Sequence, residues 1–431
     1  MNKEAKEDRR IGSEATFADR DGIQSGRLKT FGSFKYPAYR YYFGTMAGQW
    51  IAMNMQMVVL SLLVYRITGS GAILGSISLA NAVPMLVLSL VGGVIADRLA
   101  KKTILLIGEA GLAVISLGIA VALTLGFLSV ENPGSWTLLI VASFLQGIVM
   151  GLMMPATMAI IPEIVGERHL MNAISLANLA MNTLRLVAPA LTGFLVDAFD
   201  FDFVYYTQTV MYLIAVTFVA LIPGTRSTTA QNRKTLGEIK EGFRYLRRET
   251  IISLIVLFSV FCTIFGMPFT QLLPMFTEDI LKVSATGMGV LLSVSGAGSL
   301  VVSLVIASMP GKKRGLLMLL GGLTMGLALV IFSFSQWWYP SLVVIAFYGV
   351  GYTAQMTLSI ILIQSYVEPN YRGRVVSFQM MAFGFASLGT FLAGFLSEAI
   401  GIQWSVGALA TVLILMCLMM LTFAPKIRKL D

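Results

Sequence analysis

The stretch GGVIADRLAKK, residues 92–102, ends a run of thirty residues, 67–96, that contains no charged side chain. One carboxylate and three cations then follow within six residues. A helix needs about 20 mostly apolar residues to cross the hydrocarbon core of a bilayer, so thirty uncharged residues are enough for one crossing. The stretch therefore predicts a membrane-spanning helix that meets water at Asp97.

The composition extends this pattern to the whole chain. Of its 431 residues 56% are hydrophobic and only 12% are charged, and the mean hydropathy is +0.80. Soluble proteins carry about 25% charged residues. The sequence thus predicts an all-α integral membrane protein with twelve transmembrane helices. We expect these spans near residues 39–65, 70–96, 103–128, 136–161, 171–197, 203–222, 251–276, 284–309, 315–334, 339–365, 375–398 and 403–424.

The placement of lysine and arginine predicts the orientation in the membrane. With both termini in the cytoplasm, 28 of the 31 cations lie on the cytoplasmic side, as the positive-inside rule requires. Only Arg66 and Lys282 lie on the other side, and Arg185 lies within a span. The net charge of +9 therefore reflects membrane topology, and we expect no nucleic-acid partner.

Two internal matches divide the chain into halves. LVLSLV at residues 86–91 recurs as LVVSLV at 300–305, 214 residues later, and GFLVDAF at 193–199 recurs as GFLSEAI at 394–400, 201 residues later. Because the matches keep their order, they predict two pseudo-symmetric six-helix bundles related by an axis along the membrane normal.

The expected domains follow from these two halves. We expect a disordered cytoplasmic tail at 1–33, six-helix bundles at 34–222 and 251–424, a linker at 223–250, and a cytoplasmic C-terminal tail at 425–431. The linker segment LGEIKEGFRYLRRE predicts an amphipathic interfacial helix.

Several classes of function are excluded. Two cysteines and one histidine leave no spacing for a disulfide framework or a metal site, and we expect no cofactor. The missing GxxxxGK[ST] motif excludes an ATP-driven pump. The sequence contains no nucleophile–base pair of the kind that would indicate an enzyme. We expect a functional monomer in contact with membrane lipids.

The opening stretch carries a resemblance to a known family. A glycine, an Asp-Arg pair and two lysines are similar to the 2–3 loop signature of the major facilitator superfamily, with Ala100 where glycine is usual. The matching residues are Gly93, Asp97, Arg98, Lys101 and Lys102. The resemblance implies that Asp97 helps to latch the outward-facing state and that the cations hold partners and lipid headgroups. Positive-inside flanking explains the lysines as well.

A second resemblance is to one branch of that superfamily, the drug, macrolide and siderophore exporters. RLVAPALTG, residues 185–193, resembles the span-five antiporter signature, with Ala188 and Thr192 where glycines are usual. The turn Arg372-Gly-Arg374 and the linker are similar to the same branch. The resemblance covers the chain from about residue 34 to residue 429, and it implies proton antiport and a bacterial cytoplasmic membrane.

Arg185 is the one cation deep within a predicted span. Fifteen uncharged residues precede it and eleven follow it. A charge within the membrane indicates function by default, so Arg185 could bind an anionic substrate or tune a proton site. It could also tie helices together. Asn178 and Asn182 lie on or near the same helix face and could extend a polar pocket or join helices.

Other polar and aromatic residues are candidates for the substrate cavity. In this superfamily spans one, four, seven and ten line the cavity, and packing between helices is the alternative role. The candidates are Asn54, Gln56, Gln146, Gln271, Gln355, Phe265, Phe269 and Tyr352. We also expect Pro155, Pro189 and Pro268 to break helices where the cavity opens.

Proton coupling needs a carboxylate that responds to conformation, and Glu109 and Asp97 are the candidates. Glu109 lies seven residues beyond Lys102, roughly 10 Å along the helix, where a charged carboxylate is costly unless it is paired or protonated. Many antiporters of the superfamily carry an arginine in span four where this chain has Ser143. The coupling ion is therefore an expectation from the resemblance.

These observations predict a secondary active transporter that exports amphipathic or hydrophobic small molecules by alternating access, with proton antiport. Drugs and siderophores are the leading substrate classes. A lipid or lysolipid translocator of the same fold is one alternative. A non-transporting membrane sensor or scaffold is another, although the longest polar segments are only the N-terminal tail and the linker.

Overall fold

The computed structural model describes residues 32–132, 134–223, 235–309, 312–368 and 371–431. The expected disordered tail lies almost wholly outside these residues. Within the helices, side chains are described except at 90–98, 158, 162, 166–169, 171, 235–240, 242, 372, 374, 376–377, 380 and 382–383. In the described part of the chain all regular structure is helical, as predicted.

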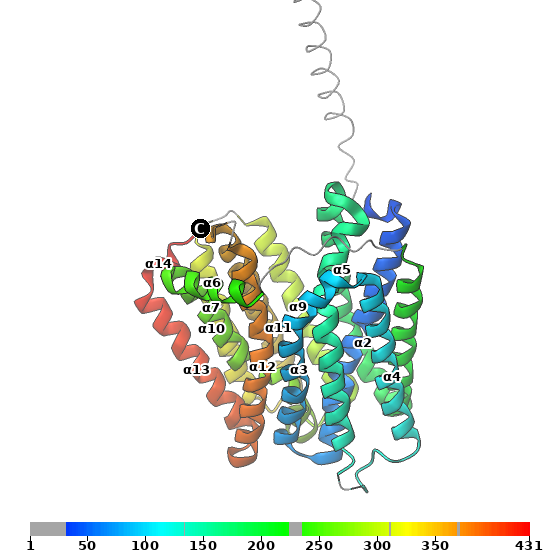
Figure 1. Ribbon diagram of the computed structural model, residues 1–431. Helices are drawn as coiled ribbons and strands as arrows, with labels where there is room; N and C mark the ends of the chain where they lie inside the picture. Colours follow the sequence, from blue (N-terminus) through cyan, green and yellow to red (C-terminus); the bar gives the residue numbers. More distant parts are fainter. Residues whose placement is uncertain (1–31, 133, 224–234, 310–311, 369–370) are drawn as a thin grey trace, which may run out of the picture.

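The helices form one bundle (Figure 1). They are α2 (Pro37–Thr68), α3 (Gly71–Arg98), α4 (Lys101–Thr124), α5 (Thr137–Leu221), α6 (Thr235–Arg248), α7 (Thr250–Gly266), α8 (Pro268–Met275), α9 (Ala285–Ser308), α10 (Arg314–Ser333), α11 (Trp338–Tyr366), α12 (Arg372–Ile400), α13 (Ile402–Phe423) and α14 (Pro425–Arg428). Short 3₁₀ and π segments cover Gly32–Lys35 and Phe276–Ile280. The predicted linker helix is present as α6.

Ten helical stretches in the described residues are long and apolar enough to cross a membrane. One of them, Asn172–Leu221, has 50 residues, more than twice the length that one crossing needs. The left-handed backbone of Asp200, with φ 75°, interrupts it between the predicted fifth and sixth spans. The predicted eleventh span lies in α12, where the described apolar stretch, Gly384–Ile400, is shorter than one crossing needs. The chain is an integral membrane protein, and the count of twelve spans stays a prediction.

The bundle has two distinct ends, which we name by their loops. The linker face carries α6, the α9–α10 connection and the C-terminus (Figure 1). The far face carries residues 66–70, 125–132, 134–136, 198–202, 277–284, 334–337 and 401. The described part of the chain begins and ends on the linker face, because Ser33 N donates to Asn172 Oδ1 at 3.0 Å and Gly315 N donates to Leu430 O at 3.1 Å. An even number of crossings is required by this arrangement.

Two helix crossings join the halves, and they are equivalent in the sequence repeat. At the α3–α12 crossing, a Cβ atom added to Gly75 would lie 2.6 Å from Phe391 Cα. At the α9–α5 crossing, a Cβ atom added to Gly289 would lie 2.9 Å from Ala190 Cα. The 214-residue offset relates the two glycines, and the 201-residue offset relates their two partners. The packing between the halves is therefore pseudo-symmetric.

Alanine at Gly289 should weaken this interface. Its Cβ atom would lie 2.3 Å from Pro189 O, which real contacts do not allow, so the halves must separate locally. We expect a loss of about 1–3 kcal/mol in the free energy of unfolding, measured by thermal melting in detergent. Gly118→Ala is the control, because no atom lies within 4 Å of its added Cβ. Equal melting temperatures for the two variants would contradict the close approach.

Candidate functional site

Asp197 joins the two halves at the far face. It lies near the end of the fifth predicted span, and α9 of the other half begins at Ala285. The Asp197 carboxylate accepts hydrogen bonds from the backbone N–H groups of Ala285 and Thr286 at 3.1 and 2.8 Å. A carboxylate placed there satisfies unpaired helix N–H groups and stabilises the positive end of the helix dipole. Asp197 is therefore an N-cap supplied from the opposite half.

Glu398 makes the equivalent contact at the other crossing. It lies near the end of α12 and accepts hydrogen bonds from Ala72 N at 3.3 Å and from the Ser70 hydroxyl, at the start of α3. The repeat offsets relate Asp197 to Glu398, and Thr286 to Ala72. We call these two contacts the twin caps. Each acid belongs to one half, and its carboxylate accepts hydrogen bonds at the first turn of a helix in the other half.

Further polar contacts surround the twin caps. Arg66 forms an ion pair with Glu278 at 2.9 Å, and the Tyr65 hydroxyl donates a hydrogen bond to Asp279. A cavity of about 390 Å³ lies beside them and is lined by Tyr65, Asp279 and Glu398 among others. The far face is thus held closed by side chains from both halves.

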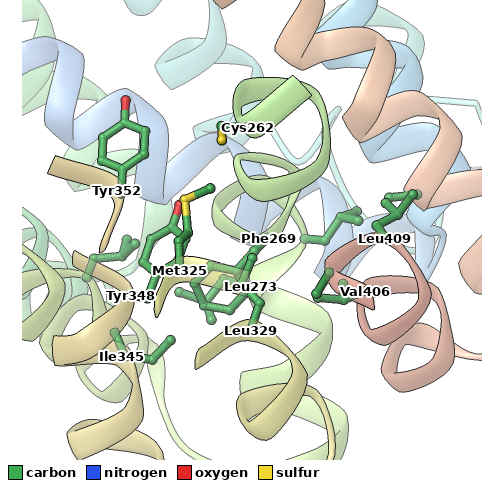
Figure 2. Close-up of a cluster of buried hydrophobic side chains, with 14 of the residues drawn as sticks. Cys262, Phe269, Leu273, Met325, Leu329, Ile345, Tyr348, Tyr352, Val406 and Leu409 are labelled. Carbon is green, nitrogen blue, oxygen red and sulfur yellow. The ribbon is translucent and has the colours of Figure 1, made fainter. Parts of the chain in front are cut away.

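Nearer the middle of the bundle, the halves meet through fewer polar groups. Ser78 Oγ donates to Ser387 Oγ at 3.1 Å. The Arg185 guanidinium lies over the ring of Tyr352, 5.3 Å from its centroid. Arg185 is exposed, whereas Tyr352 is buried at the edge of the core of the second half. Figure 2 shows the Tyr352 hydroxyl directed away from Phe269, Leu273 and the rest of that cluster.

At the linker face, the described polar contacts remain within one half. Lys101 pairs with Glu163 of α5, and Lys102 Nζ donates to the carbonyls of Ala220 and Ile222 at 2.7 and 2.6 Å. Both lysines therefore hold the first half together, and Lys102 satisfies carbonyls at a helix C-terminus. Other expected gating side chains lie outside the described part of the structure. These are Asp97, Arg98, Arg372 and Arg374, together with Gly93, whose surroundings are likewise not described.

Glu109 is fully buried in the first half. Its exposed fraction is 0%, and both carboxylate oxygens lack a hydrogen-bond partner among the described residues. The Met153 side chain packs against the neighbouring Gly108. Tyr212 lies within electrostatic range of the Glu109 carboxylate. No cation of the linker face reaches Glu109 in the described contacts.

A chain of three glutamines links α2 to α5 within the first half. Gln56 Nε2 donates to Gln146 Oε1 at 3.2 Å, and Gln208 Nε2 donates to Gln56 Oε1 at 2.9 Å. Gln208 is one helical turn before Tyr212, which neighbours Glu109. Two predicted residues, Gln56 and Gln146, are therefore brought together. Gln208 and Tyr212 are not among the predicted residues, although a glutamine within the apolar sixth span is the same kind of signal as Gln56.

The remaining cavity candidates have different surroundings. Gln355 is buried and donates to Ser259 and Ser359 at 3.3 and 3.2 Å, so it ties α7 to α11, which is the alternative packing role. Phe269 lies in the packed core against Phe276, Phe332 and Tyr348, which is likewise the packing role. Asn54 Nδ2 donates to Trp50 O at 2.8 Å. Phe265 and Gln271 are half-buried, and Asn178 and Asn182 are exposed on α5.

The three predicted helix breaks differ. Helix α7 ends at Gly266 and α8 begins at Pro268, so the chain changes helix at that point. Helix α5 instead continues through Pro155 and Pro189, and the expectation of breaks there is corrected. Proline is tolerated within membrane helices where neighbouring helices compensate for the lost hydrogen bond.

Comparison with known proteins identifies relatives of the whole chain. A family model described as Major Facilitator Superfamily matches residues 42–387 and 281–430. The Staphyloferrin A transporter of Staphylococcus aureus is 23% identical, with 88% of this chain and 94% of the relative covered. Macrolide efflux protein A of Streptococcus pyogenes is 22% identical, with 94% of this chain and 100% of the relative covered.

The fold also matches solved structures. A D-xylose–proton symporter superposes with a TM-score of 0.72 over 92% of this chain and 100% of its own, at 16% sequence identity. At this identity the match shows the fold alone. The relatives are transporters and not enzymes, which confirms that expectation.

Proposed function

The chain belongs to the Major Facilitator Superfamily, and from this premise we propose that it is a secondary active transporter that exports amphipathic or hydrophobic small molecules. The names of its relatives include siderophore and macrolide transport. These names support export and the drug or siderophore class of substrate. We place the linker face in the cytoplasm of a bacterial cell, because it carries most of the cations and the positive-inside rule favours that side.

The twin caps are the observation that carries the proposal. Alternating access requires contacts between the halves that form at one face and break when the other face closes. Asp197 and Glu398 make such contacts at the far face, through hydrogen bonds that water can replace. Among the described residues, the polar contacts between the halves lie at the far face or near the middle of the bundle. These contacts support the proposal that the far face is closed when the linker face opens.

Glu109 is the proposed coupling group. It lies inside α4, and its carboxylate is fully buried without a hydrogen-bond partner among the described residues. A charged carboxylate is costly there, so its protonation would change when the halves move and water or a cation approaches. The glutamine chain offers hydrogen-bonding groups between α2 and α5 in the same half. Proton entry at the far face would then drive export.

Transport by inverted membrane vesicles tests the proposed function. Vesicles with and without the protein would receive a panel of fluorescent amphiphiles, including a lysolipid, and their accumulation would be followed before and after the pH gradient is collapsed. We expect at least one amphiphile to accumulate, and collapse to reduce its accumulation at least fivefold. Accumulation that ignores the gradient would contradict proton antiport. Accumulation of the lysolipid alone would favour a lipid translocator.

A further inference from the structure

Arg185 stands apart from the other cations of the chain. It lies at the middle depth of α5, where that helix crosses α9, and Gly296 of α9 packs against its backbone. The side chain reaches across to Tyr352 of α11, so the guanidinium sits between the two halves. It is exposed although the surrounding helices are apolar. A ligand between the halves would meet this group.

The ring of Tyr352 holds Arg185 without neutralising it. A guanidinium over an aromatic face is attracted by the ring quadrupole and keeps its full charge. The planar guanidinium also keeps donors free for a second partner, because five N–H groups radiate from it. Tyr348 stacks on Tyr352, with 6.2 Å between ring centroids, and its hydroxyl donates to Gly266 O. The aromatic support is therefore itself fixed in the core.

In the described part of the structure, no acid pairs with Arg185. Among the described residues, ion pairs join Arg66 to Glu278 and Lys101 to Glu163, and neither involves Arg185. Helices α9 and α11, which face it, contain no aspartate or glutamate. Residues 170–196 of α5 contain none either. Glu109 is buried inside the first half, and its carboxylate has no hydrogen-bond partner among the described residues.

We infer that Arg185 binds an acidic group of the cargo, so that the transported amphiphile is an anion with a carboxylate or similar planar oxyanion. A cation within the membrane is stable when an anion pairs with it. Arginine binds carboxylates through two parallel hydrogen bonds, and Asn182, one turn earlier on the same helix, offers further donors. This inference rests on the proposed transport function and assigns its substrate class.

The assignment also bears on the energy source. An anion that leaves the cytoplasm moves with the inside-negative potential, and one charge at 100 mV corresponds to a concentration ratio of roughly fifty-fold. Export of an anion in exchange for a proton moves positive charge inward twice over. We therefore expect a potential alone, without a pH gradient, to support accumulation of an anionic cargo.

The test uses three probes that differ only in their end group. These are dansylaminoundecanoate, its primary amide, and the corresponding trimethylammonium compound. Binding is measured by thermal melting of purified protein in detergent, and transport by uptake into inverted vesicles. The variants are Arg185→Gln, which removes the charge, and Arg185→Lys, which keeps it. Lys282→Gln is the control, because it removes an exposed cation from the far face.

We expect the carboxylate probe to raise the melting temperature of the wild type and of Lys282→Gln more than the other two probes do. In Arg185→Gln this preference should vanish, with binding of the carboxylate at least tenfold weaker and binding of the amide changed by less than twofold. Arg185→Lys should retain a weaker preference for the carboxylate. The melting temperature without probe shows whether each variant is folded.

Two outcomes would overturn the inference. One is a wild-type protein that binds the amide or the ammonium probe with the same affinity as the carboxylate probe. The other is an equal loss for all three probes in Arg185→Gln, which would make Arg185 a structural tie. Vesicle uptake is scored separately. Selective binding without any uptake would refute the proposed transport while the anion site stands.

Discussion

Replacing Asp197 with asparagine and Glu398 with glutamine together should open the far face. Each substitution keeps the size of the side chain and removes the charge that stabilises a helix N-terminus in the other half. A charge in this position contributes about 1 kcal/mol when partly exposed, so the pair contributes roughly 2 kcal/mol. The equilibrium between the closed and open far face should then shift by about thirty-fold.

Thiol accessibility measures this shift. A cysteine placed at Ser387, which contacts Ser78 across the halves, would be alkylated by a membrane-impermeant reagent added from the far face. We expect labelling at least tenfold faster in the double variant than in the parent. Asp202→Asn is the matched control, because Asp202 is a far-face acid that contacts Thr124 of its own half. Equal rates in all three proteins would rule out the twin caps as a latch.

Glu109→Gln should abolish accumulation driven by the pH gradient. Glutamine has nearly the same shape and hydrogen-bonding capacity, but it cannot exchange a proton with water. Because the carboxylate is buried without a partner, its removal should leave the melting temperature unchanged or higher. In inverted vesicles with an acidified interior, we expect gradient-driven uptake to fall at least tenfold, with downhill flux retained.

The exposed far-face acid Glu131 supplies the control for Glu109. Glu131→Gln removes the same charge from a loop and should transport as the wild type does. The pH dependence of the uptake rate should flatten in Glu109→Gln alone. A Glu109→Gln variant with undiminished gradient-driven uptake would show that another group carries the proton.

Much of the fold could be predicted from hydrophobic periodicity and charge placement. Uncharged runs of spanning length predict most helices directly. The internal repeat already relates Asp197 to Glu398, because the two acids occupy the same position in its two copies. Their capping contacts could not be predicted, because they depend on how the end of one helix meets the start of another in the opposite half. Alignment of the two halves places the acids and the helix starts at equivalent positions. This equivalence is the only feature of the sequence that points to the capping contacts.

The interior of the bundle was harder to predict. Polar residues in apolar helices can face a cavity or another helix, and periodicity does not distinguish the two. Gln355 and Phe269 thus lie in packed contacts, whereas Gln56 and Gln146 form a chain whose third member, Gln208, was not singled out. The depth of Arg185 was apparent from the uncharged residues around it. Its partner, Tyr352, depends on the angle at which the halves cross.

The most direct test of alternating access is the distance between the halves at both faces, measured by electron–electron resonance of spin-labelled cysteines in lipid nanodiscs. Phe127 and Trp337 offer exposed far-face positions in different halves, and Thr103 and Lys426 offer exposed linker-face positions. The two native cysteines are buried. We predict that the far-face distance lengthens as the linker-face distance shortens when the twin caps are removed. Distances that stay fixed at both faces, or that lengthen together, would contradict the account.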